Sequence, residues 1–349
     1  MSGGVDSSVA AALLVEQGHR VVGVTMKTFC YDDGKPQGRT CCGLDGILDA
    51  RRVAEALDIP HYVIDMEESF TASVIDDFVS EYAAGRTPNP CVRCNSNTKI
   101  PHLLERGRLL GCDVIATGHY ARTMPRPDGG VRVLRGRDAS KDQTYFLWGV
   151  PAPVAPHLRF PVGELNKSEV RARARALGLV TADKPESQEI CFVPGGDYTE
   201  FLAARLGADH PALAPGPIID AAGTEMGWHD GYGRYTIGQR RGLGGGRGIP
   251  LYVIDVRPES NQVVVGDRAA LTRGDIGLVD LNWLAEPPTP GERVLVQIRH
   301  RATPAAATVE GVSAARASLT FDDPQRAVTP GQSGAIYRGD ELIGGGRIR

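Results

Sequence analysis

The sequence contains no apolar run that approaches the roughly 18 residues needed to span a membrane. It also has no basic start followed by an apolar stretch and a cleavage site. We therefore expect a cytoplasmic protein with no membrane partner. The net charge of −3 creates no overall field that would attract nucleic acid, so any RNA binding must depend on local basic patches. With 349 residues, 42% of them hydrophobic, the chain is long enough for two or three domains with separate cores.

The sequence also has few cysteines, and their odd number argues against a structural disulfide framework. The seven lie at positions 30, 41, 42, 91, 94, 112 and 191. In a reducing compartment such a set favours thiol chemistry or metal ligation. Cys112 lies beside an expected strand and is interpreted as a core residue. Cys30, Cys41 and Cys42 are interpreted as reduced loop thiols, with a metal site as the alternative, since two adjacent cysteines do not readily ligate one tetrahedral ion.

The clearest motif stands at the start, Ser2-Gly3-Gly4-Val5-Asp6-Ser7-Ser8, before an expected helix over 7–17. Two glycines let backbone N–H groups converge on a phosphate, and the helix N-terminus adds its positive dipole end. An acid such as Asp6 suits Mg²⁺ between phosphates. The loop lacks the Gly-Lys-Ser/Thr of a Walker A motif and the GxGxxG of a dinucleotide site. The alternative is a serine-rich helix cap without a ligand.

The order of the expected elements predicts an α/β fold for the first half. Strands are expected at 21–26, 61–65 and 113–117, with helices at 44–57 and 70–84 between them, which is typical of a doubly wound parallel sheet. Ligands of such sheets lie at the carboxyl ends of the strands. Met26 and Gly118 are therefore candidates to line a nucleotide pocket. Because such a phosphate loop normally follows a buried strand, we expect the natural start to lie upstream of Met1.

The second half differs in composition and is rich in proline and glycine. Short alternating segments at 251–254, 262–265, 293–298 and 317–321 predict two small β-rich modules. The expected domains are 1–205, 206–281 and 282–349.

Two further segments carry thiols with distinct surroundings. Cys91 and Cys94 lie in 86–95, which we expect to be a loop stiffened by Pro88 and Pro90. Arg86 and Arg93 beside them would lower a thiol pKa by stabilising the thiolate. Cys191 follows a polar stretch and begins an apolar one.

Taken together, the motifs resemble those of the tRNA-specific 2-thiouridylases. SGGVDSS, GRTPNP with its following CN, ATGHY, KDQTYFL, FPVGEL, ICF, YTIGQRRGLG and TPGQS occur in the order of that family over essentially the whole chain. The first motif alone would indicate only the superfamily of PP-loop ATP pyrophosphatases. The resemblance implies a doubly wound, adenine nucleotide α-hydrolase-like domain followed by the two β-rich modules.

By this resemblance the protein is a tRNA sulfurtransferase that replaces the C2 oxygen of the wobble uridine, position 34 of the tRNA, by sulfur. ATP would activate the oxygen as an adenylate with release of pyrophosphate. The residues implied to bind ATP, with Mg²⁺, are Ser2, Gly3, Gly4, Val5, Asp6, Ser7, Ser8, Met26 and Gly118. Cys191 is implied to carry a persulfide, and Cys94 to attack it and form a transient disulfide with it. The implied partners are tRNAs of the Lys, Glu and Gln type and a persulfide sulfur-donor protein.

The resemblance also implies where tRNA is held. Asn89, Pro90 and Cys91 would lie against the target base, which must leave its stack before it can react. The other implied contacts are His119, Lys141, Asp142, Gln143, Arg299, His300 and Gln332. For His119 the alternative is a satisfied buried histidine. The basic helix expected at 167–177 either lies along phosphates or presents a solvated face.

One departure from the family leaves an alternative open. Many relatives have an aspartate where this chain has Cys91, so the acid–base role is unassigned. Cys91, Cys94 and Cys191 could instead hold an iron–sulfur cluster, while zinc would want a fourth ligand. Two other functions remain as hypotheses: an ATP pyrophosphatase ligase or amidotransferase acting on a small molecule, and a cysteine-rich RNA- or metal-binding module without ATP turnover.

Overall fold

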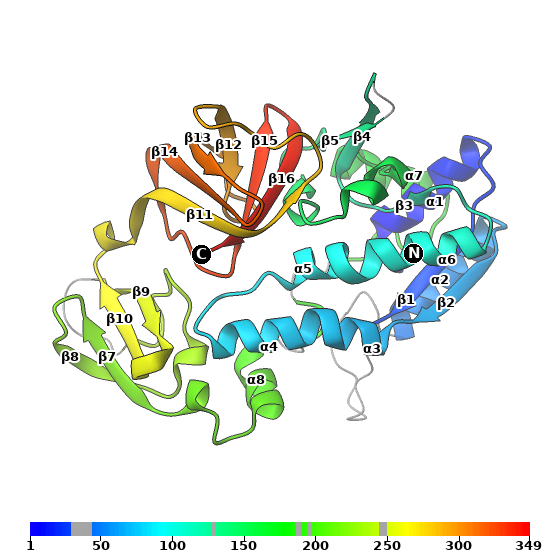
Figure 1. The fold of residues 1–349 in the computed structure, drawn as a ribbon. Coiled ribbons are helices and arrows are strands. Elements are labelled where there is room, and N and C mark those ends of the chain that lie inside the picture. Colours follow the sequence, from blue (N-terminus) through cyan, green and yellow to red (C-terminus); the bar gives the residue numbers. More distant parts are fainter. Residues whose placement is uncertain (29–43, 128–129, 186–189, 194–196, 244–249) are drawn as a thin grey trace.

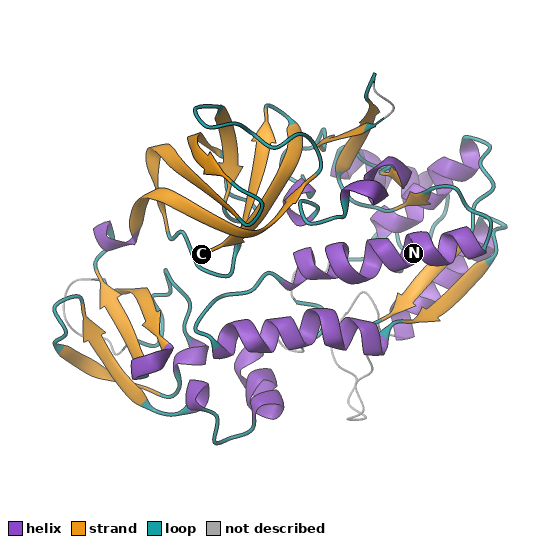
Figure 2. Cartoon of the chain, in the orientation of Figure 1, coloured by secondary structure: helices purple, strands orange, loops and turns teal. Residues whose placement is uncertain are grey.

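The computed structural model describes residues 1–28, 44–127, 130–185, 190–193, 197–243 and 250–349. Cys30, Cys41 and Cys42 lie outside these ranges. An α/β part carries the N-terminus, and two β-rich parts, a barrel and a smaller sheet, lie beside each other at the far end of two long helices (Figures 1 and 2). No helix within the described ranges is long and apolar enough to cross a membrane. The α/β part followed by two β-rich parts is the architecture predicted from the sequence.

The strands of the α/β part pair in parallel, as the alternation of elements predicted. β1 (Gly23–Lys27) pairs with β2 (His61–Asp65), and β3 (Ile115–Ala116) pairs with β6 (Leu158–Arg159), a two-residue strand that the sequence did not indicate. The helices around them are α1 (Val5–Glu16), α2 (Leu44–Ala56) and α7 (Lys167–Ala176). Buried apolar residues of α1, α2 and α7 share one core, which contains Val9, Val53 and Val170.

Two long helical rods connect the α/β part to the β-rich parts. The first runs through α3 (Glu67–Phe70), the π turn η1 (Thr71–Ile75) and α4 (Asp76–Ala83). The second runs through α5 (Pro90–Arg93), the π turn η2 (Cys94–Lys99) and α6 (Ile100–Leu109). The two rods lie side by side (Figure 1) and touch where η1 meets η2.

The second rod corrects the loop expected over 86–95. Pro90 occupies the first position of α5, where its missing N–H has no partner to lose, and Asn89 caps the helix by accepting a hydrogen bond from Val92 N at 3.3 Å. Cys91 and Cys94 therefore lie on helical turns. Only the segment before Asn89 is a loop.

The smaller β-rich part is a four-stranded sheet in the order β8–β7–β10–β9. Its strands are β7 (Gly216–Asp220), β8 (Glu225–His229), β9 (Tyr252–Arg257) and β10 (Gln262–Gly266), and only β7 and β10 pair in parallel. Helix α8 (Tyr198–Leu206) precedes it. Short 3₁₀ turns occupy Thr144–Phe146, Ala152–His157, Pro211–Leu213, Tyr232–Arg234, Pro258–Ser260 and Ala269–Leu271.

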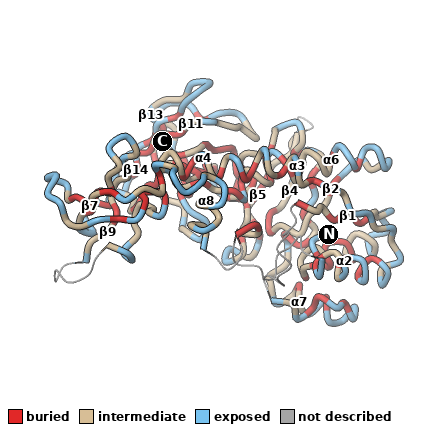
Figure 3. Tube along the Cα trace, turned by 90° about the horizontal axis from the view of Figure 1, so that it is seen from below, coloured by how far each residue is buried: buried red, intermediate tan, exposed pale blue. Residues whose placement is uncertain are grey.

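The C-terminal part is a barrel that closes where β11 pairs with both β14 and β16. Its strands are β11 (Thr272–Trp283), β12 (Arg293–Gln297), β13 (Ala305–Val312), β14 (Arg316–Arg326), β15 (Ser333–Arg338) and β16 (Glu341–Ile348). β11 runs through residues 281 and 282, where we expected a boundary. The hairpin β4 (Ala121–Pro125) and β5 (Val131–Arg135) of the α/β part extends the sheet from β16. Buried positions run through all three parts in Figure 3.

Candidate functional site

The phosphate loop, residues 2–8, is held together by hydrogen bonds of its own serines. Ser7 Oγ and Ser8 Oγ donate to Gly4 O at 3.0 and 2.9 Å, and Ser2 N donates to Ser7 Oγ at 3.1 Å. Val5 is buried in the core beneath the loop. Gly4 caps α1 without a side-chain hydrogen bond, so no side chain of the cap covers the first N–H groups of the helix. Such a helix N-terminus is a ready site for an anion.

Glycines bring neighbouring segments close to this helix N-terminus. Gly3 has φ +66°, and a Cβ there would collide with the backbone of Gly46 in α2. A Cβ on Gly118 would lie 2.6 Å from Ser7 N. Met26 lies at the carboxyl end of β1, as expected, and Gly118 follows β3. The structure thus places Gly118 directly against the phosphate loop.

Asp6 is held by two residues that sequence reasoning did not connect with it. Lys167 Nζ lies 2.7 and 2.9 Å from the two carboxylate oxygens, and Tyr120 OH donates to Oδ1 at 2.9 Å. Lys167 is the first residue of α7, where the helix dipole disfavours a cation. A lysine at this position of a helix is therefore a feature of the sequence that indicates an anionic partner in another segment.

Cys94 and Cys191, far apart in the sequence, pack against the same cluster of hydrophobic side chains. Its buried members include Phe70 and Phe78 of the first rod and Phe192. The Phe192 ring centroid lies 5.2 Å from that of Phe78 and 5.7 Å from that of Phe70, both edge to face. Residue 191 is thereby anchored through its neighbour to the rod that lies beside Cys94.

Cys91 is exposed, unlike Cys94 and Cys191, which are partly buried. Among the residues that the structure describes, which include Cys91, Cys94 and Cys191, no three His, Cys, Asp or Glu side chains are arranged to hold a metal ion. The iron–sulfur alternative therefore has no support from the arrangement of these thiols.

His119 connects the phosphate loop with the second helical rod, α5–η2–α6, the cysteine rod, which carries Cys91 and Cys94. It follows Gly118, and its Nδ1 lies 2.8 Å from Thr117 Oγ1. Burial, and next the Lys99 ammonium at the end of η2, lower the pKa of His119 to about 3. At neutral pH the ring is therefore uncharged and contributes hydrogen bonding rather than positive charge. The side chain is only partly buried, so both the interpretation as a structural histidine and that as a tRNA contact stay open.

The predicted triplet 141–143 makes mostly internal contacts. Asp142 is buried and accepts hydrogen bonds from Gly136 N at 3.0 Å and from Thr144 Oγ1 at 2.8 Å. Gln143 Oε1 accepts from Tyr120 N at 3.0 Å. Lys141 is partly exposed. Asp142 and Gln143 thus stabilise the turn that presents Lys141.

The barrel contributes two exposed basic residues, Arg299 and His300, and a glutamine that makes contacts within the protein. Arg299 and His300 follow β12 and are exposed, and the His300 ring centroid lies 4.5 Å from that of Phe146. Gln332 instead faces the cysteine rod, where its Nε2 donates to Thr87 O at 3.1 Å and Pro88 O at 2.9 Å. Gln332 thus contacts the loop that precedes α5, whereas His300 packs against Phe146.

The arginines of α7 are occupied within the protein. Arg171 donates to Ala182 O at 2.7 Å, Arg173 pairs with Glu16, and Arg175 pairs with Asp183 at 2.8 Å. These contacts favour the interpretation of a structural helix over one that lies along phosphates.

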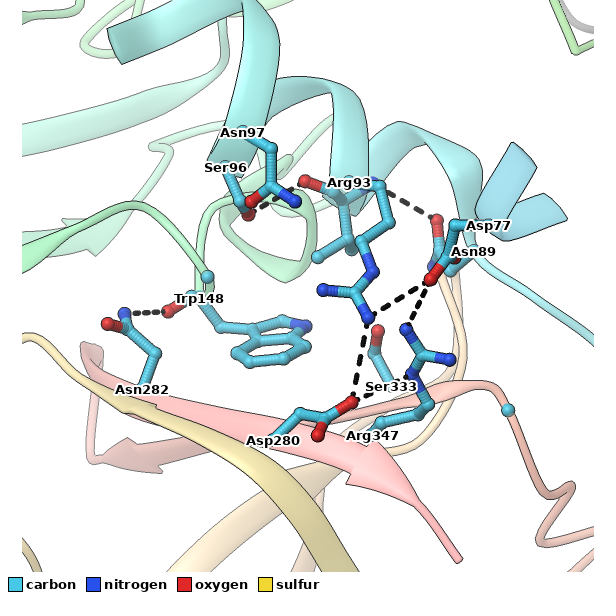
Figure 4. A pocket seen from close by; sticks show the side chains of 13 residues that line it. Asp77, Asn89, Arg93, Ser96, Asn97, Trp148, Asp280, Asn282, Ser333 and Arg347 are labelled. Atoms are coloured by element: carbon cyan, nitrogen blue, oxygen red, sulfur yellow. Dashed lines mark hydrogen bonds and ion pairs between the residues drawn. The ribbon is translucent and has the colours of Figure 1, made fainter. Parts of the chain in front are cut away.

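A cavity of about 80 Å³ separates the cysteine rod from the barrel (Figure 4). Arg93 of α5 lies 3.1 Å from Asp77 and 3.5 Å from Asp280, and Arg347 of β16 lies 2.7 Å from the same Asp77 oxygen. The indole of Trp148 lies beside these charges. The cavity has room for a few water molecules but not for a nucleotide. The charged residues around it form a joint between the cysteine rod and the barrel, which the sequence did not indicate.

Comparison with known proteins gives one family over the whole chain. The profile of the tRNA methyl transferase HUP domain matches residues 1–195, that of the tRNA methyl transferase PRC-barrel domain residues 200–267, and that of the aminomethyltransferase β-barrel domain residues 273–348. The α/β part thus has the fold of a nucleotide-binding HUP domain, which fits the phosphate loop at the start of α1.

Curated relatives are similar in sequence to this chain over nearly their full length. The chain is similar to the tRNA-specific 2-thiouridylases MnmA of Geobacter metallireducens (48% identity over 352 residues, all of this chain and 95% of the relative) and Carboxydothermus hydrogenoformans (49% over 356 residues, all of this chain and 96% of the relative). The same holds for that of Moorella thermoacetica, with 48% identity over 351 residues and 98% of the relative covered. The chain therefore belongs to the family of tRNA-specific 2-thiouridylases.

Proposed function

We propose that this protein is an ATP-dependent sulfurtransferase that replaces the C2 oxygen of the wobble uridine of tRNA by sulfur. One observation carries the proposal beyond family membership: Cys94 and Cys191 pack against the same aromatic cluster. Thiol–disulfide exchange requires the attacking and attacked sulfurs to meet, so two cysteines on one cluster are suited to it. The relatives from Geobacter and Carboxydothermus bear the name of this activity.

The N-terminus of α1 is proposed to hold the phosphates of ATP. The N–H groups of its first turn, with the hydroxyls of Ser2 and Ser7, supply donors, and Gly118 adds no side chain where it lies against Ser7. Asp6 is the carboxylate that would hold Mg²⁺ beside the phosphates. The fit is reasonable because Mg²⁺ is commonly bound by one or two carboxylates together with substrate phosphates and water. When bound, the metal would offset phosphate charge, while Lys167 keeps Asp6 in place.

The first chemical step activates a poor leaving group. The C2 oxygen of the uridine attacks the α-phosphorus of ATP, an O–P bond forms, and pyrophosphate leaves. The oxygen can then depart as part of AMP when a nucleophile adds at C2. A neutral His119 beside the loop can donate or accept a hydrogen bond without adding charge.

The second step delivers the sulfur. The Cys94 thiolate attacks Cys191 Sγ of the Cys191 persulfide, the S–S bond of the persulfide breaks, and hydrosulfide leaves as the Cys94–Cys191 disulfide forms. Hydrosulfide adds at C2, AMP departs, and 2-thiouridine results. A dithiol must reduce the disulfide, and a persulfide donor protein must reload Cys191, before the next turnover.

The tRNA is proposed to lie over the start of the cysteine rod. Asn89, Pro90 and the exposed Cys91 would face the extruded base, and the exposed Arg299 and His300 would meet the backbone with Lys141. Arginine and lysine on such a surface supply the phosphate contacts that a net charge of −3 does not provide. tRNAs of the Lys, Glu and Gln type are the proposed substrates.

The test compares three serine variants of the full chain. Cys94→Ser and Cys191→Ser should abolish 2-thiouridine in tRNA, measured by mass spectrometry of the nucleosides, while part of the ATP-dependent release of pyrophosphate persists. Cys112→Ser, a thiol outside the aromatic cluster, is the control and should thiolate normally. Thiolation by the Cys191→Ser protein, or 4-thiouridine as the product, would overturn the proposal. Turnover of ATP on a small carboxylate that is indifferent to both cysteines would favour a ligase instead.

A further inference from the structure

A chain of hydrogen bonds between buried side chains runs from the turn of Lys141 into the barrel. Thr144 Oγ1 lies 2.8 Å from Asp142 Oδ2 and 3.2 Å from Tyr337 OH of β15. The Tyr337 hydroxyl donates in turn to Gln297 Oε1 of β12 at 3.1 Å. None of the four residues that form the chain is more than 9% exposed. A buried polar network whose members are bonded to one another stiffens the segments that it joins.

The chain ends on the turn that carries the exposed basic residues of the barrel. Gln297 Nε2 donates to Arg299 O at 3.1 Å. Because the amide nitrogen points to this carbonyl, the amide oxygen points to Tyr337, and the tyrosine hydroxyl is the donor between them. Burial raises the pKa of Tyr337, so the hydroxyl keeps its proton at neutral pH. The backbone of the Arg299 turn is therefore joined to Asp142 through buried side chains alone.

Aromatic residues beside this chain pack on the same part of the barrel. The hydroxyl of Tyr145 lies 3.2 Å from Ser333 O and 3.4 Å from Ile298 O. The ring centroid of Phe146 lies 4.5 Å from that of His300. The short turn that follows Lys141 thus holds the end of β12 by ring packing as well as by hydrogen bonds.

Arg135 of β5 holds the ring of Tyr337 independently of the hydroxyl. Its guanidinium carbon lies 4.1 Å from the centroid of the Tyr337 ring, and its Nη1 lies 3.9 Å from Asp142 Oδ2. A substitution that removes only the hydroxyl therefore leaves the ring and its cation in place and breaks the hydrogen-bond chain at one point.

We propose that Tyr337 is a positioning residue for tRNA binding. Its hydroxyl, through the side chains bonded to it, keeps the turn of Lys141 and the turn of Arg299 in one alignment, so that tRNA meets both turns at once. Cations that are aligned in advance bind phosphates without the entropy cost of ordering the two turns on association. The inference rests on the proposed tRNA surface, but one of its two measurements needs no tRNA.

The experiment compares two substitutions of a buried tyrosine in the full chain. Tyr337→Phe removes the hydroxyl and keeps the ring. Tyr232→Phe is the matched control, because Tyr232 is 3% exposed and its hydroxyl donates to Ala83 O of α4 at 2.7 Å. The affinity for an unmodified tRNA transcript of the Lys type is measured for each variant, alone and combined with Arg299→Met. Hydrogen exchange over 298–302 is measured without tRNA.

Tyr337→Phe should weaken tRNA binding by roughly fivefold, while kcat at saturating tRNA stays within about twofold. Arg299→Met should then weaken binding less in the Tyr337→Phe protein than in the unsubstituted one, because a turn out of alignment has already lost part of its phosphate contact. The effects of Arg299→Met and Tyr232→Phe should simply multiply. Exchange over 298–302 should rise several-fold in Tyr337→Phe and stay unchanged in Tyr232→Phe.

Gln297→Met is the second variant and decides the question if Tyr337→Phe does not fold. It breaks the same chain one bond nearer to Arg299 and should show the same faster exchange and the same reduced effect of Arg299→Met.

Unchanged exchange in Tyr337→Phe, together with effects of Tyr337→Phe and Arg299→Met that multiply, would overturn the inference. It would also fail if Lys141→Met and Arg299→Met both left the affinity for tRNA unchanged, since tRNA would then not lie on this surface. The sulfur chemistry is tested separately by the cysteine variants. If thiolation requires Cys94 and Cys191 but Tyr337→Phe binds tRNA as tightly as the unsubstituted protein, only the positioning role is lost.

Discussion

Lys167 Nζ lies within hydrogen-bond distance of both carboxylate oxygens of Asp6, at 2.7 and 2.9 Å. The ammonium also lies 5.7 Å from the centroid of the Tyr120 ring, and the hydroxyl of the same tyrosine donates to Asp6. The pair joins the first turn of α7 to the first turn of α1. A carboxylate in the phosphate loop is thereby fixed in direction before any nucleotide binds.

We expect Lys167→Met to weaken ATP binding. A charge-assisted hydrogen bond contributes about 1.5–3 kcal/mol, so the KM for ATP should rise by roughly tenfold or more when the ammonium is removed. Asp6 would then add an uncompensated negative charge next to the phosphates. The measurement is the ATP dependence of tRNA-stimulated pyrophosphate release.

The control for this variant lies on the same helix. Arg175→Met removes an exposed cation that pairs with the exposed Asp183. An exposed ion pair contributes about 1 kcal/mol or less, so this variant should leave the KM for ATP unchanged. Equal KM values for Lys167→Met and Arg175→Met would contradict a role of Lys167 in the phosphate loop.

Among the cations at the joint between the barrel and the rods, we expect the removal of Arg347 to lower the free energy of unfolding most. It contacts three carboxylates, those of Asp77 at 2.7 Å, Glu81 at 2.5 Å and Asp280 at 3.3 Å. Its side chain is only 14% exposed, and that of Glu81 only 5%. Arg347→Met should therefore lower the free energy of unfolding by about 3 kcal/mol, because the largely buried Glu81 and Asp77 each lose one of their two cations and keep only Arg86 and Arg93.

Urea unfolding measures this loss, with Arg293→Met as the comparison. Arg293 pairs with Asp322 on the outside of the same barrel, where its side chain is 63% exposed. Its removal should cost about 1 kcal/mol or less. Similar losses for the two variants would show that burial of the joint does not strengthen its ion pairs.

Local patterns predicted the elements well where one segment determines its own structure. The apolar runs at 61–65 and 293–298 became β2 and β12 within a residue. The pairing of the hairpin β4–β5 with β16 was not predictable, because its hydrogen bonds join residues about two hundred positions apart in the sequence. The prolines at 88 and 90 suggested a loop, yet Pro90 suits the first turn of a helix equally well.

For the candidate site, too, local features were predictable and contacts between remote segments were not. Motifs located the phosphate loop and the thiols, since those residue types are tied to their chemistry. The partners of Asp6 and of Gln332 come from remote segments, and only the tertiary fold brings them together. Lys167 at a helix start was the one local irregularity that signalled a distant partner.

His119 should make stability depend on pH in the acid range. Its pKa in the folded protein, about 3, lies below the ordinary value of 6.5, so the unfolded chain binds the proton more readily. Stability is therefore full above pH 6.5 and is lost as the pH falls below it, by up to about 1.4 kcal/mol for each pH unit. His119→Gln, which cannot take up this proton, should show a shallower decline between pH 6.5 and 5.

Urea unfolding of both proteins at several pH values measures the difference in slope. The ring of His119 can also be followed directly by NMR, where its Cε1 proton should not titrate above pH 5. Titration near pH 6.5, or parallel pH curves for the two proteins, would rule out a ring that its surroundings keep neutral.

Gly331→Ala tests the fit between the barrel turn and the loop. Gly331 has φ +89°, and a Cβ there meets the backbone of Thr87. Gly291, in the same barrel, has φ +84° but no atom within 4 Å of an added Cβ. Each alanine adds the strain of a left-handed residue, about 1–2 kcal/mol, so the difference between the two variants isolates the collision. We expect Gly331→Ala to lose more unfolding free energy than Gly291→Ala, and only Gly331→Ala to impair thiolation. If both variants lose stability equally and retain full activity, the turn does not press on the loop, because strain at φ alone would then explain both losses.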